Sequence, residues 1–231
     1  NGMTKLFDCF LNNNLLEGKL ARFFGFREKT YFRFRIGKHR NMESKTTLRT
    51  LVRSASARKE SESLTEISER IMLAVERMDE FVRARDVALY WSLPDEVRTH
   101  AFAERWSESK RIWLPVMRGE HLSLRRFTGR EALDTARFGI QEPSSRQEIA
   151  PAAVDLIVVP GMGFDAHGNR LGRGKGFYDR LLATEGPLKV GVCFDFQLFD
   201  RIPVEPHDRP VDRVVCGSAD GIAVFGREHK A

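Results

Sequence analysis

Glycines and cations are interleaved in one short segment, residues 170–176. Gly172, Gly174 and Gly176 hold alternate positions. Three cations stand among them: Arg170, Arg173 and Lys175. Glycine lets a backbone come close to a ligand and turn its N–H groups toward oxyanions. A helix expected from about Lys175 adds the positive end of its dipole. The segment therefore predicts a site that binds a polyphosphate.

Two common phosphate-binding motifs do not fit this segment. A P-loop places Ser or Thr directly after its lysine, whereas Lys175 is followed by Gly176. A dinucleotide fingerprint reads GxGxxG directly after its strand, whereas this GxGxG pattern begins 13 residues after Val159. On these residues alone, a solvated turn without a ligand remains the alternative.

The surrounding residues extend the segment into a longer and more specific pattern. Residues 160–179 read PGMGFDAHGNRLGRGKGFYD. This stretch resembles the 5-formyltetrahydrofolate cyclo-ligase (5,10-methenyltetrahydrofolate synthetase) family almost continuously. The family usually has Tyr where this chain has Phe177, so one hydroxyl is absent while the aromatic ring is kept.

Four further segments match the family in the expected order. Residues 45–49 (KTTLR) resemble an ATP-binding helix that holds two cations one turn apart. The other three are residues 90–96, resembling the folate-binding end of a strand, residues 138–143, resembling an aromatic wall, and residues 202–212, a loop with carboxylates. Together the matches cover nearly all of residues 45–217.

The resemblance implies a reaction. It implies an ATP-dependent cyclo-ligase that converts 5-formyltetrahydrofolate to 5,10-methenyltetrahydrofolate and releases ADP and phosphate. The family's reaction passes through a phosphorylated formyl intermediate, with ATP as co-substrate and Mg²⁺ as cofactor. Phosphoryl transfer needs charge neutralisation and alignment of the reacting groups more than covalent help from the protein.

The resemblance also assigns roles to residues of this chain. The positions that match the ATP site are Lys45, Arg49, Arg170, Leu171, Gly172, Arg173, Gly174, Lys175, Gly176, Phe177, Tyr178 and Asp179. Those expected to act in catalysis are Arg173, Lys175 and Tyr178. Those that match the folate site are Trp91, Glu96, Phe138 and Tyr178. We expect Asp179 and Asp208 to bind Mg²⁺, since hard oxygen ligands suit this ion, with Asp212 in reserve.

Each of these assignments has an ordinary structural alternative. The cation pair at residues 45–49 could form a solvated helix face, and the aromatic residues could belong to the core. Glu96 could simply favour the start of a helix through the helix dipole. The carboxylates of residues 202–212 could be turn residues in a proline-rich loop. The functional interpretation depends on all the matches occurring together and in order.

Local patterns indicate alternating helices and strands. Helices are expected at residues 45–59, 64–78, 95–106 and 175–184, and strands at residues 86–91, 111–116, 122–127, 154–159, 189–194 and near 214. Ser63 and Glu66 are expected to form a capping box at the start of the second helix. Residues 160–174 are too rich in glycine and proline for the interior of a helix or strand.

This alternation predicts the fold of residues 42–231. The β-branched run at residues 154–159 ends in Pro-Gly, as a buried parallel strand does before a functional loop. Strands separated by helices favour an α/β fold. We therefore expect a Rossmann-like, three-layer single domain with a mostly parallel sheet flanked by helices.

Residues 1–41 differ from the rest of the chain. They carry nine Lys and Arg against three Asp and Glu, which accounts for the whole formal net charge of +6. They also hold seven of the 17 phenylalanines and sustain no core-like periodicity. This leader is interpreted as a non-native or misassigned start upstream of Met42. A targeting presequence and a basic-aromatic arm for nucleic acid are the alternatives.

Composition narrows the compartment and the partners. Three cysteines without a CxxC pair favour the cytoplasm, and no apolar run is long enough for a membrane-spanning helix. We expect a monomer that binds no membrane. The rival interpretations are a nucleic-acid-binding protein on an inactive cyclo-ligase-like body and a phosphosugar or coenzyme A-type enzyme. The neutral formal charge of residues 42–231 disfavours nucleic acid as a partner.

Overall fold

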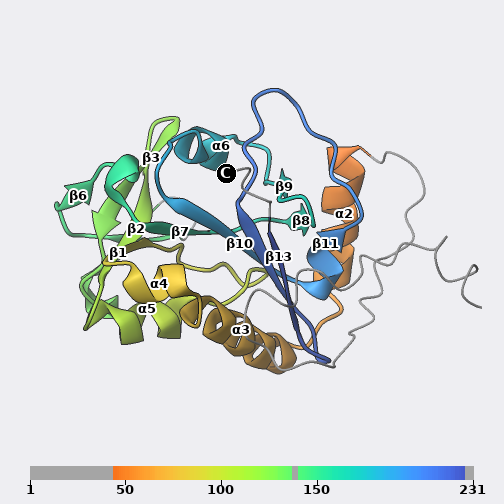
Figure 1. Ribbon diagram of the computed structural model, residues 1–231, viewed down its shortest axis with the longest axis horizontal. Coiled ribbons are helices and arrows are strands. Elements are labelled where there is room, and N and C mark those ends of the chain that lie inside the picture. The colour runs from red at the N-terminus through yellow and green to blue at the C-terminus, as the bar shows by residue number, and fades with distance from the viewer. Residues whose placement is uncertain (1–43, 137–139, 227–231) are drawn as a thin grey trace, which may run out of the picture. The chain divides into compact units, whose positions relative to one another are not determined.

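The computed structural model describes residues 44–136 and 140–226 (Figure 1). The leader expected at residues 1–41 lies outside the described residues. Five adjacent strands of the main sheet run parallel: β12 (Arg213–Gly217), β10 (Leu188–Phe194), β7 (Leu156–Val159), β1 (Asp86–Ala88) and β2 (Arg111–Arg118). Three antiparallel strands complete its edges: β13 (Ile222–Gly226) beside β12, then β3 (His121–Arg126) and β6 (Glu148–Ile149) beside β2.

The parallel strands are mostly apolar because both faces of the sheet are covered. All four residues of β7 are buried, and so are all three residues of β1. β-Branched side chains such as those of Val158 and Val159 pack well on a pleated surface. A parallel sheet with two covered faces needs such continuous apolar strands, and the observed burial agrees.

Helices cover the two faces of this sheet (Figure 1). One face carries α3 (Ser61–Glu76), α4 (Asp79–Arg83) and α5 (His100–Ser107). Ile71 and Val75 of α3 are fully buried there, in one cluster with Val190 and Val215 of the sheet. The opposite face carries α6 (Phe177–Leu182), whose Leu181 and Leu182 are buried.

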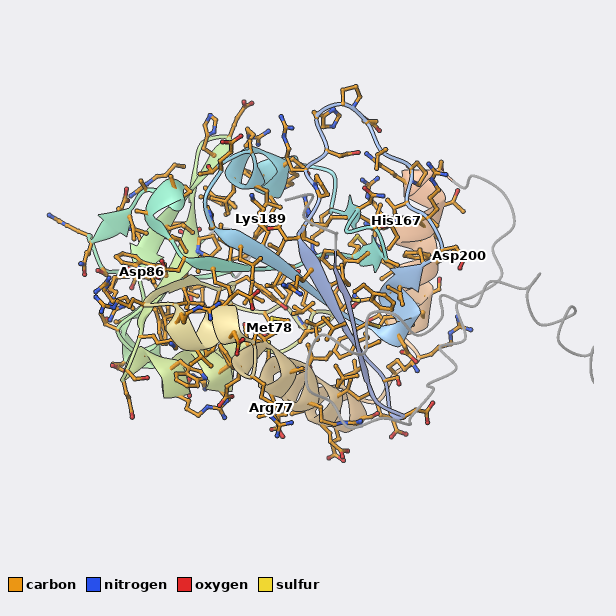
Figure 2. The ribbon with its side chains drawn as sticks, viewed as in Figure 1. Arg77, Met78, Asp86, His167, Lys189 and Asp200 are labelled. Atoms are coloured by element: carbon orange, nitrogen blue, oxygen red, sulfur yellow. The ribbon has the colours of Figure 1, made fainter. Side chains whose placement is uncertain are left out.

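A smaller unit packs beside the main sheet. It contains α2 (Lys45–Ser56) and a short sheet of β11 (Leu198–Phe199), β8 (Gly163–Asp165) and β9 (Arg170–Leu171). Leu48 and Val52 of α2 are buried against Leu171 and Phe199. The turn between β8 and β9 carries the exposed His167 (Figure 2). A separate pair, β4 (Leu133–Thr135) and β5 (Gln141–Pro143), is antiparallel.

The predicted fold class is confirmed: the protein is an α/β fold with a mainly parallel central sheet and helices on both faces. Within the described ranges, no helix combines the length and the apolar character needed to cross a membrane.

Two local predictions are wrong. The capping box is absent because α3 begins at Ser61, which puts Ser63 inside the first turn, and the N-cap Glu60 makes no side-chain hydrogen bond. Residues 160–174 are not one open loop, since β8 and β9 pair within them. Gly163 lies in β8, and glycine is needed there because an added Cβ would stand 2.5 Å from the Phe199 ring. Tertiary packing has overridden the local signal of the glycine.

Candidate functional site

A cavity of about 300 Å³ opens beyond the carboxyl ends of the parallel strands. Its lining comes from the segment after β1, the β2–β3 hairpin, residues 140–142, the end of β7, and the stretch from Arg170 to Asp179. Ligands of open α/β sheets bind in the crevice at this edge. The cavity therefore brings together segments that are far apart in the sequence.

The glycine loop, residues 172–176, connects β9 to α6. Gly174 has φ +97° and Gly176, the N-cap of α6, has φ +66°, both in the region that favours glycine. A Cβ at Gly172 would stand 2.9 Å from Nη1 of Arg170. The backbone path therefore requires glycine at positions 174 and 176, and a side chain at position 172 would displace the Arg170 guanidinium. The loop lies against the cavity.

Arg170 lies beneath the glycine loop. It is 8% exposed, and its Nη2 donates to Oδ1 of Asp179 at 3.0 Å. Its guanidinium carbon lies 5.5 Å from the ring centroid of Tyr178, within cation–π range. Its buried Nε has no hydrogen-bond partner among the described residues. Arg170 thus stabilises the first turn of α6 through Asp179 and also lines the cavity.

Arg173 joins two carboxylates at the cavity. Its Nη2 lies 2.6 Å from Oδ1 of Asp95 and 3.1 Å from Oε1 of Glu96. The other oxygen of Glu96 accepts the Leu93 N–H at 3.0 Å. Burial raises the pKa of Glu96, although the Leu93 N–H and Arg173 oppose this effect. We call this group, Arg173 with Asp95 and Glu96, the Arg173 bridge.

Lys45 and Arg49 project from α2 beside the glycine loop. Arg49 Nε donates to the carbonyl oxygen of Gly172 at 2.8 Å. Lys45 Nζ lies 2.6 Å from Oδ2 of Asp208 and 3.1 Å from Oε1 of Glu205. Burial lowers the pKa of Lys45, but the two carboxylates outweigh burial and raise it overall. Arg49 therefore contacts the loop directly, whereas Lys45 contacts the carboxylates of residues 205–208, and neither cation lines the cavity itself.

The other predicted ATP positions divide between cavity and core. Lys175 is exposed and lines the cavity, as do Phe177 and Tyr178. Burial raises the pKa of Tyr178 well above its ordinary value, so its hydroxyl keeps its proton. Leu171 is fully buried against α2 and supports the loop from the core. The Arg180 guanidinium lies 5.3 Å from the Phe177 ring centroid.

Two of the three predicted folate aromatics, Trp91 and Tyr178, lie in the described residues. Trp91 lines the cavity and stacks on His100, with ring centroids 4.1 Å apart. His100 in turn contacts Ser92 through its Nε2, which fixes the imidazole. Burial lowers the pKa of His100, which favours a neutral ring beneath the indole. Phe138 lies outside the described residues.

Asp179 and Asp208 lie near the glycine loop, where a metal ion could bind together with a phosphate. The backbone N–H of Arg209 donates to Oδ1 of Asp179 at 3.4 Å, which brings the neighbouring Asp208 to the start of α6. Burial would raise the pKa of Asp208, but Lys45 and the Glu205 N–H lower it overall. The part of the chain that the structure describes has no group of three His, Cys, Asp or Glu suited to a metal. Two carboxylates suit Mg²⁺, which takes its remaining ligands from phosphates and water.

The reserve candidate Asp212 lies elsewhere. It directly precedes β12, and its Oδ2 accepts the Lys189 N–H at the start of β10, at 2.8 Å. This is the amino-terminal edge of the sheet, opposite the cavity. Asp212 therefore serves the backbone of a neighbouring strand.

An apolar wall of the cavity and the Asp95 partner of Arg173 were not predicted from the sequence. Pro115 and Met117 of β2, with Leu122 of β3, line the cavity on the side of the hairpin. The sequence contained a sign of this wall, because Pro115 and Met117 are two residues apart and so share one face of a strand. The local sequence indicates only a turn at Asp95, and nothing in it reveals the contact with Arg173.

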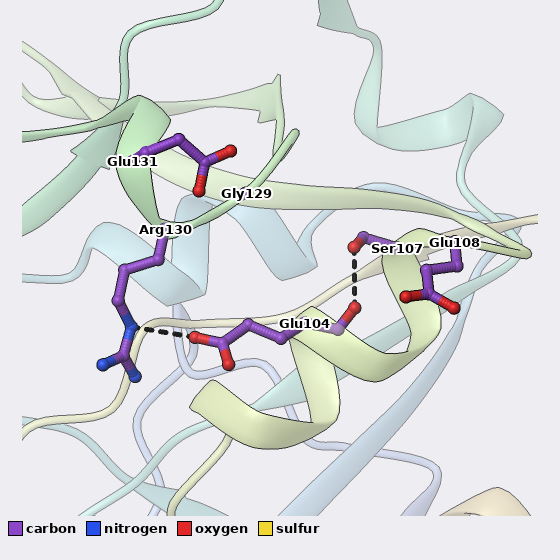
Figure 3. Close-up of a pocket in the computed structure, with 6 residues that line it drawn as sticks. All are labelled: Glu104, Ser107, Glu108, Gly129, Arg130 and Glu131. Atoms are coloured by element: carbon purple, nitrogen blue, oxygen red, sulfur yellow. Dashed lines mark hydrogen bonds and ion pairs between the residues drawn. The ribbon is translucent and has the colours of Figure 1, made fainter.

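A second hollow, of about 400 Å³, lies at the end of α5 (Figure 3). Its lining is polar and exposed, and Arg130 Nε there pairs with Oε1 of Glu104 at 2.8 Å. Ser107 Oγ donates to the Glu104 carbonyl oxygen at 2.7 Å. The hollow has no apolar wall and no buried charged group, so its ion pair is an ordinary surface pair.

Comparisons with known proteins agree with this site. The 5-formyltetrahydrofolate cyclo-ligase family model matches residues 41–217. A 5-formyltetrahydrofolate cyclo-ligase of Haemophilus influenzae is 32% identical over 144 residues, 58% of this chain and 77% of the relative. That of Escherichia coli strain K12 is 34% identical over 146 residues, 59% and 80% of the two chains.

A solved structure extends the likeness to the fold. The 5,10-methenyltetrahydrofolate synthetase of Aquifex aeolicus superposes with a TM-score of 0.70 at 35% identity, covering 81% of this chain and 96% of that one. The family match also contains the glycine loop and both halves of the cavity. The chain is therefore an enzyme that belongs to the 5-formyltetrahydrofolate cyclo-ligase family.

Proposed function

We propose that this protein cyclises 5-formyltetrahydrofolate to 5,10-methenyltetrahydrofolate at the expense of ATP, with Mg²⁺, in the cavity beside the glycine loop. The carrying observation is that the Arg173 bridge joins the glycine loop to the buried carboxylate of Glu96 within one cavity. A phosphate-binding loop and a folate-binding strand end are thereby within reach of one guanidinium. This arrangement suits a reaction between two substrates.

The chemistry explains why ATP is needed. The formyl group on the fifth-position nitrogen is an amide, whose resonance makes its oxygen a poor leaving group. The formyl oxygen attacks the γ-phosphorus of ATP, and ADP leaves with the electron pair of the broken P–O bond. The tenth-position nitrogen then attacks the activated carbon and loses its proton. Phosphate departs with the former formyl oxygen, leaving the methenyl bridge.

The cations around the loop carry the phosphate half of this proposal. Arg173 and Lys175 line the cavity and suit a γ-phosphate that gains and shifts charge during transfer. Lys45 and Arg49 approach from α2, and Arg49 already contacts the loop carbonyl of Gly172. Loop N–H groups and the start of α6 add further donors. Arg170 contributes indirectly, because its guanidinium donates to Asp179 and positions that carboxylate.

The opposite wall carries the folate half. Glu96 presents a carboxylate of 10% exposure, which suits the paired N–H donors of a pterin ring. Trp91, Met117 and Leu122 supply an apolar surface for a flat ring. Tyr178 closes the cavity as a neutral phenol. Phe138 is kept in this role on the family resemblance alone.

The metal proposal rests on Asp179 and Asp208. When bound, Mg²⁺ would neutralise charge on the phosphates. Asp208 is paired with Lys45 in this structure, so the two groups can separate to serve metal and phosphate respectively. We further propose that the enzyme works as a monomer. We place it in the cytoplasm, which the cysteine content favours.

The test is a rise in near-ultraviolet absorbance when purified protein meets 5-formyltetrahydrofolate and Mg-ATP. The matched controls omit ATP, omit Mg²⁺, or use folded Arg173→Ala. We expect a rise that requires ATP and falls on the order of a hundredfold in the variant. A flat trace from folded wild-type protein contradicts the proposed reaction.

A further inference from the structure

The Arg173 bridge uses one nitrogen for two carboxylates. Nη2 of Arg173 contacts Asp95 at 2.6 Å and Glu96 at 3.1 Å. Asp95 and Glu96 are adjacent in the sequence, whereas Arg173 is 77 residues from Glu96. The contact therefore spans the two walls assigned above to folate and to phosphate.

The two carboxylates differ in burial. The side chain of Asp95 is 32% exposed, whereas that of Glu96 is 10% exposed. Water can solvate Asp95 if Arg173 leaves it. Glu96 would keep only the Leu93 N–H on its other oxygen. An uncompensated buried charge is costly, so removing Arg173 from Glu96 is unfavourable unless another donor replaces it.

We propose that the Arg173 bridge couples the binding of the two substrates, so that each makes the other bind more tightly. This inference rests on the proposed function. Triphosphate withdraws Arg173 from Glu96, and the N–H donors of the pterin then satisfy the Glu96 carboxylate. ATP alone leaves Glu96 without its cation, and folate alone must displace Arg173. Only the complex with both substrates satisfies both groups.

The two carboxylates contribute differently to this coupling. Arg173 leaves Asp95 whenever ATP binds, whether or not folate is present, so Asp95 weakens ATP binding equally in both cases. Arg173 leaves Glu96 when either substrate binds. The first substrate to bind therefore breaks the Arg173–Glu96 contact, and the second binds without that free-energy cost. The coupling free energy between the two substrates therefore equals the free energy of the Arg173–Glu96 contact.

The experiment measures the dissociation constant of a non-hydrolysable ATP analogue, adenosine 5′-(β,γ-imido)triphosphate with Mg²⁺, by titration calorimetry. Each titration is run with and without saturating 5-formyltetrahydrofolate. We expect the folate to tighten analogue binding to wild-type protein by about tenfold, within the usual range of coupling between sites. Equal affinity under the two conditions would overturn the inference.

Two adjacent variants separate coupling from simple charge removal. Glu96→Gln should bind the analogue without folate as tightly as wild type does with folate, and folate should add nothing. Asp95→Asn removes the same charge from the same nitrogen. It should tighten the analogue under both conditions and keep the about tenfold ratio. A ratio that survives Glu96→Gln, or one that disappears in Asp95→Asn, contradicts the inference.

A third variant keeps the test sharp if Glu96→Gln binds folate too weakly. Arg173→Ala should lose the coupling from the other side, because no guanidinium then competes with the pterin. Glu131→Gln, at the exposed hollow of Figure 3, removes one negative charge outside the cavity and should behave as wild type. If wild type binds neither ligand, the proposed function itself fails. If it binds both without coupling, only the present inference fails.

Discussion

The two ends of the central sheet use acidic residues in different ways. At the amino-terminal end, Asp155 accepts the N–H groups of Arg85 and Asp86 at 2.8 and 2.9 Å, and Asp212 accepts that of Lys189 (Figure 2 labels Asp86 and Lys189). At the carboxyl-terminal end, three carboxylates each contact the cation of a side chain: Glu96 with Arg173, Asp179 with Arg170, and Asp208 with Lys45.

The difference lies in the partners. A backbone N–H in a strand is fixed, and it cannot leave its acceptor without local unfolding. A lysine or arginine side chain can rotate toward a ligand, so its carboxylate partner can be exchanged. The amino-terminal carboxylates thus serve stability, whereas those at the cavity hold cations that a phosphate can recruit. Position relative to strand direction separates the two roles.

The sharpest test of this contrast is at Asp208. Asp208→Asn removes the charge that the metal proposal requires, so we expect activity to fall on the order of a hundredfold. The melting temperature should change little, because the Lys45 contact is partly exposed. Steady-state rates at saturating Mg-ATP, with folding checked by circular dichroism, measure both effects. Activity within about threefold of wild type would remove Asp208 from the metal site.

Asp86 also pairs with a cation, but at the amino-terminal end and away from the cavity, so Asp86→Asn should have the reverse effect. Asp86 is buried and accepts from Arg111 and from the indole Nε1 of Trp113 at 2.9 Å. Losing its charge should lower the free energy of unfolding by about 2 kcal/mol, since hydrogen bonds to charged groups are the stronger ones. Urea denaturation measures this change. The turnover number per folded molecule should stay as in wild type, and a lost turnover with unchanged stability would break the comparison.

The pH dependence of the Asp86 contribution follows from its partners. Hydrogen bonding from Arg111 lowers the pKa of Asp86 below its ordinary value of 3.8. A group with a lowered folded pKa stabilises fully above its unfolded pKa and loses this contribution as the pH falls through the folded one. The difference in unfolding free energy between wild type and Asp86→Asn should thus be constant near neutrality and shrink below about pH 4. Denaturation curves at several pH values test this trend.

The smallest effect is expected at Asp212. Asp212→Asn keeps an oxygen that can accept the Lys189 N–H, so stability should fall by less than about 1 kcal/mol. Activity should be unchanged, in contrast to Asp208→Asn four residues away. Parallel assays of the two variants measure the contrast directly. A large loss of activity with Asp212→Asn would mean that the amino-terminal edge also takes part in the reaction.

These two aspartates also illustrate how far the sequence could predict the site. Both lie in one proline-rich segment, and residue type alone makes them equal metal candidates. The deciding fact is that β12 begins at Arg213, which places Asp212 at the sheet edge far from the cavity. The glycine loop was predictable because three alternate glycines among cations are typical of an anion-binding loop. Strand pairing and register, which place Asp212, depend on the whole fold.

Arg170 and the β8–β9 pair show the same limit. The sequence pattern indicates that Arg170 is a cation near phosphate, and its residue type says nothing about its burial beneath Gly172. The pair itself forms in a glycine-rich stretch because Phe164 and Leu171 are fully buried there. The local sequence therefore predicts where the loop lies in the chain. Which side chains are buried against it depends on tertiary packing.

The contact between α2 and the glycine loop affects how the enzyme is made. Arg49 and Gly172 are 123 residues apart, so a ribosome releases α2 long before its partner exists. During that interval Leu48 and Val52 have no Phe199 or Leu171 to pack against. Because long-range contacts form only after the intervening chain is available, the phosphate wall is completed late in translation. A nascent chain halted before residue 160 should therefore carry α2 as an undocked segment.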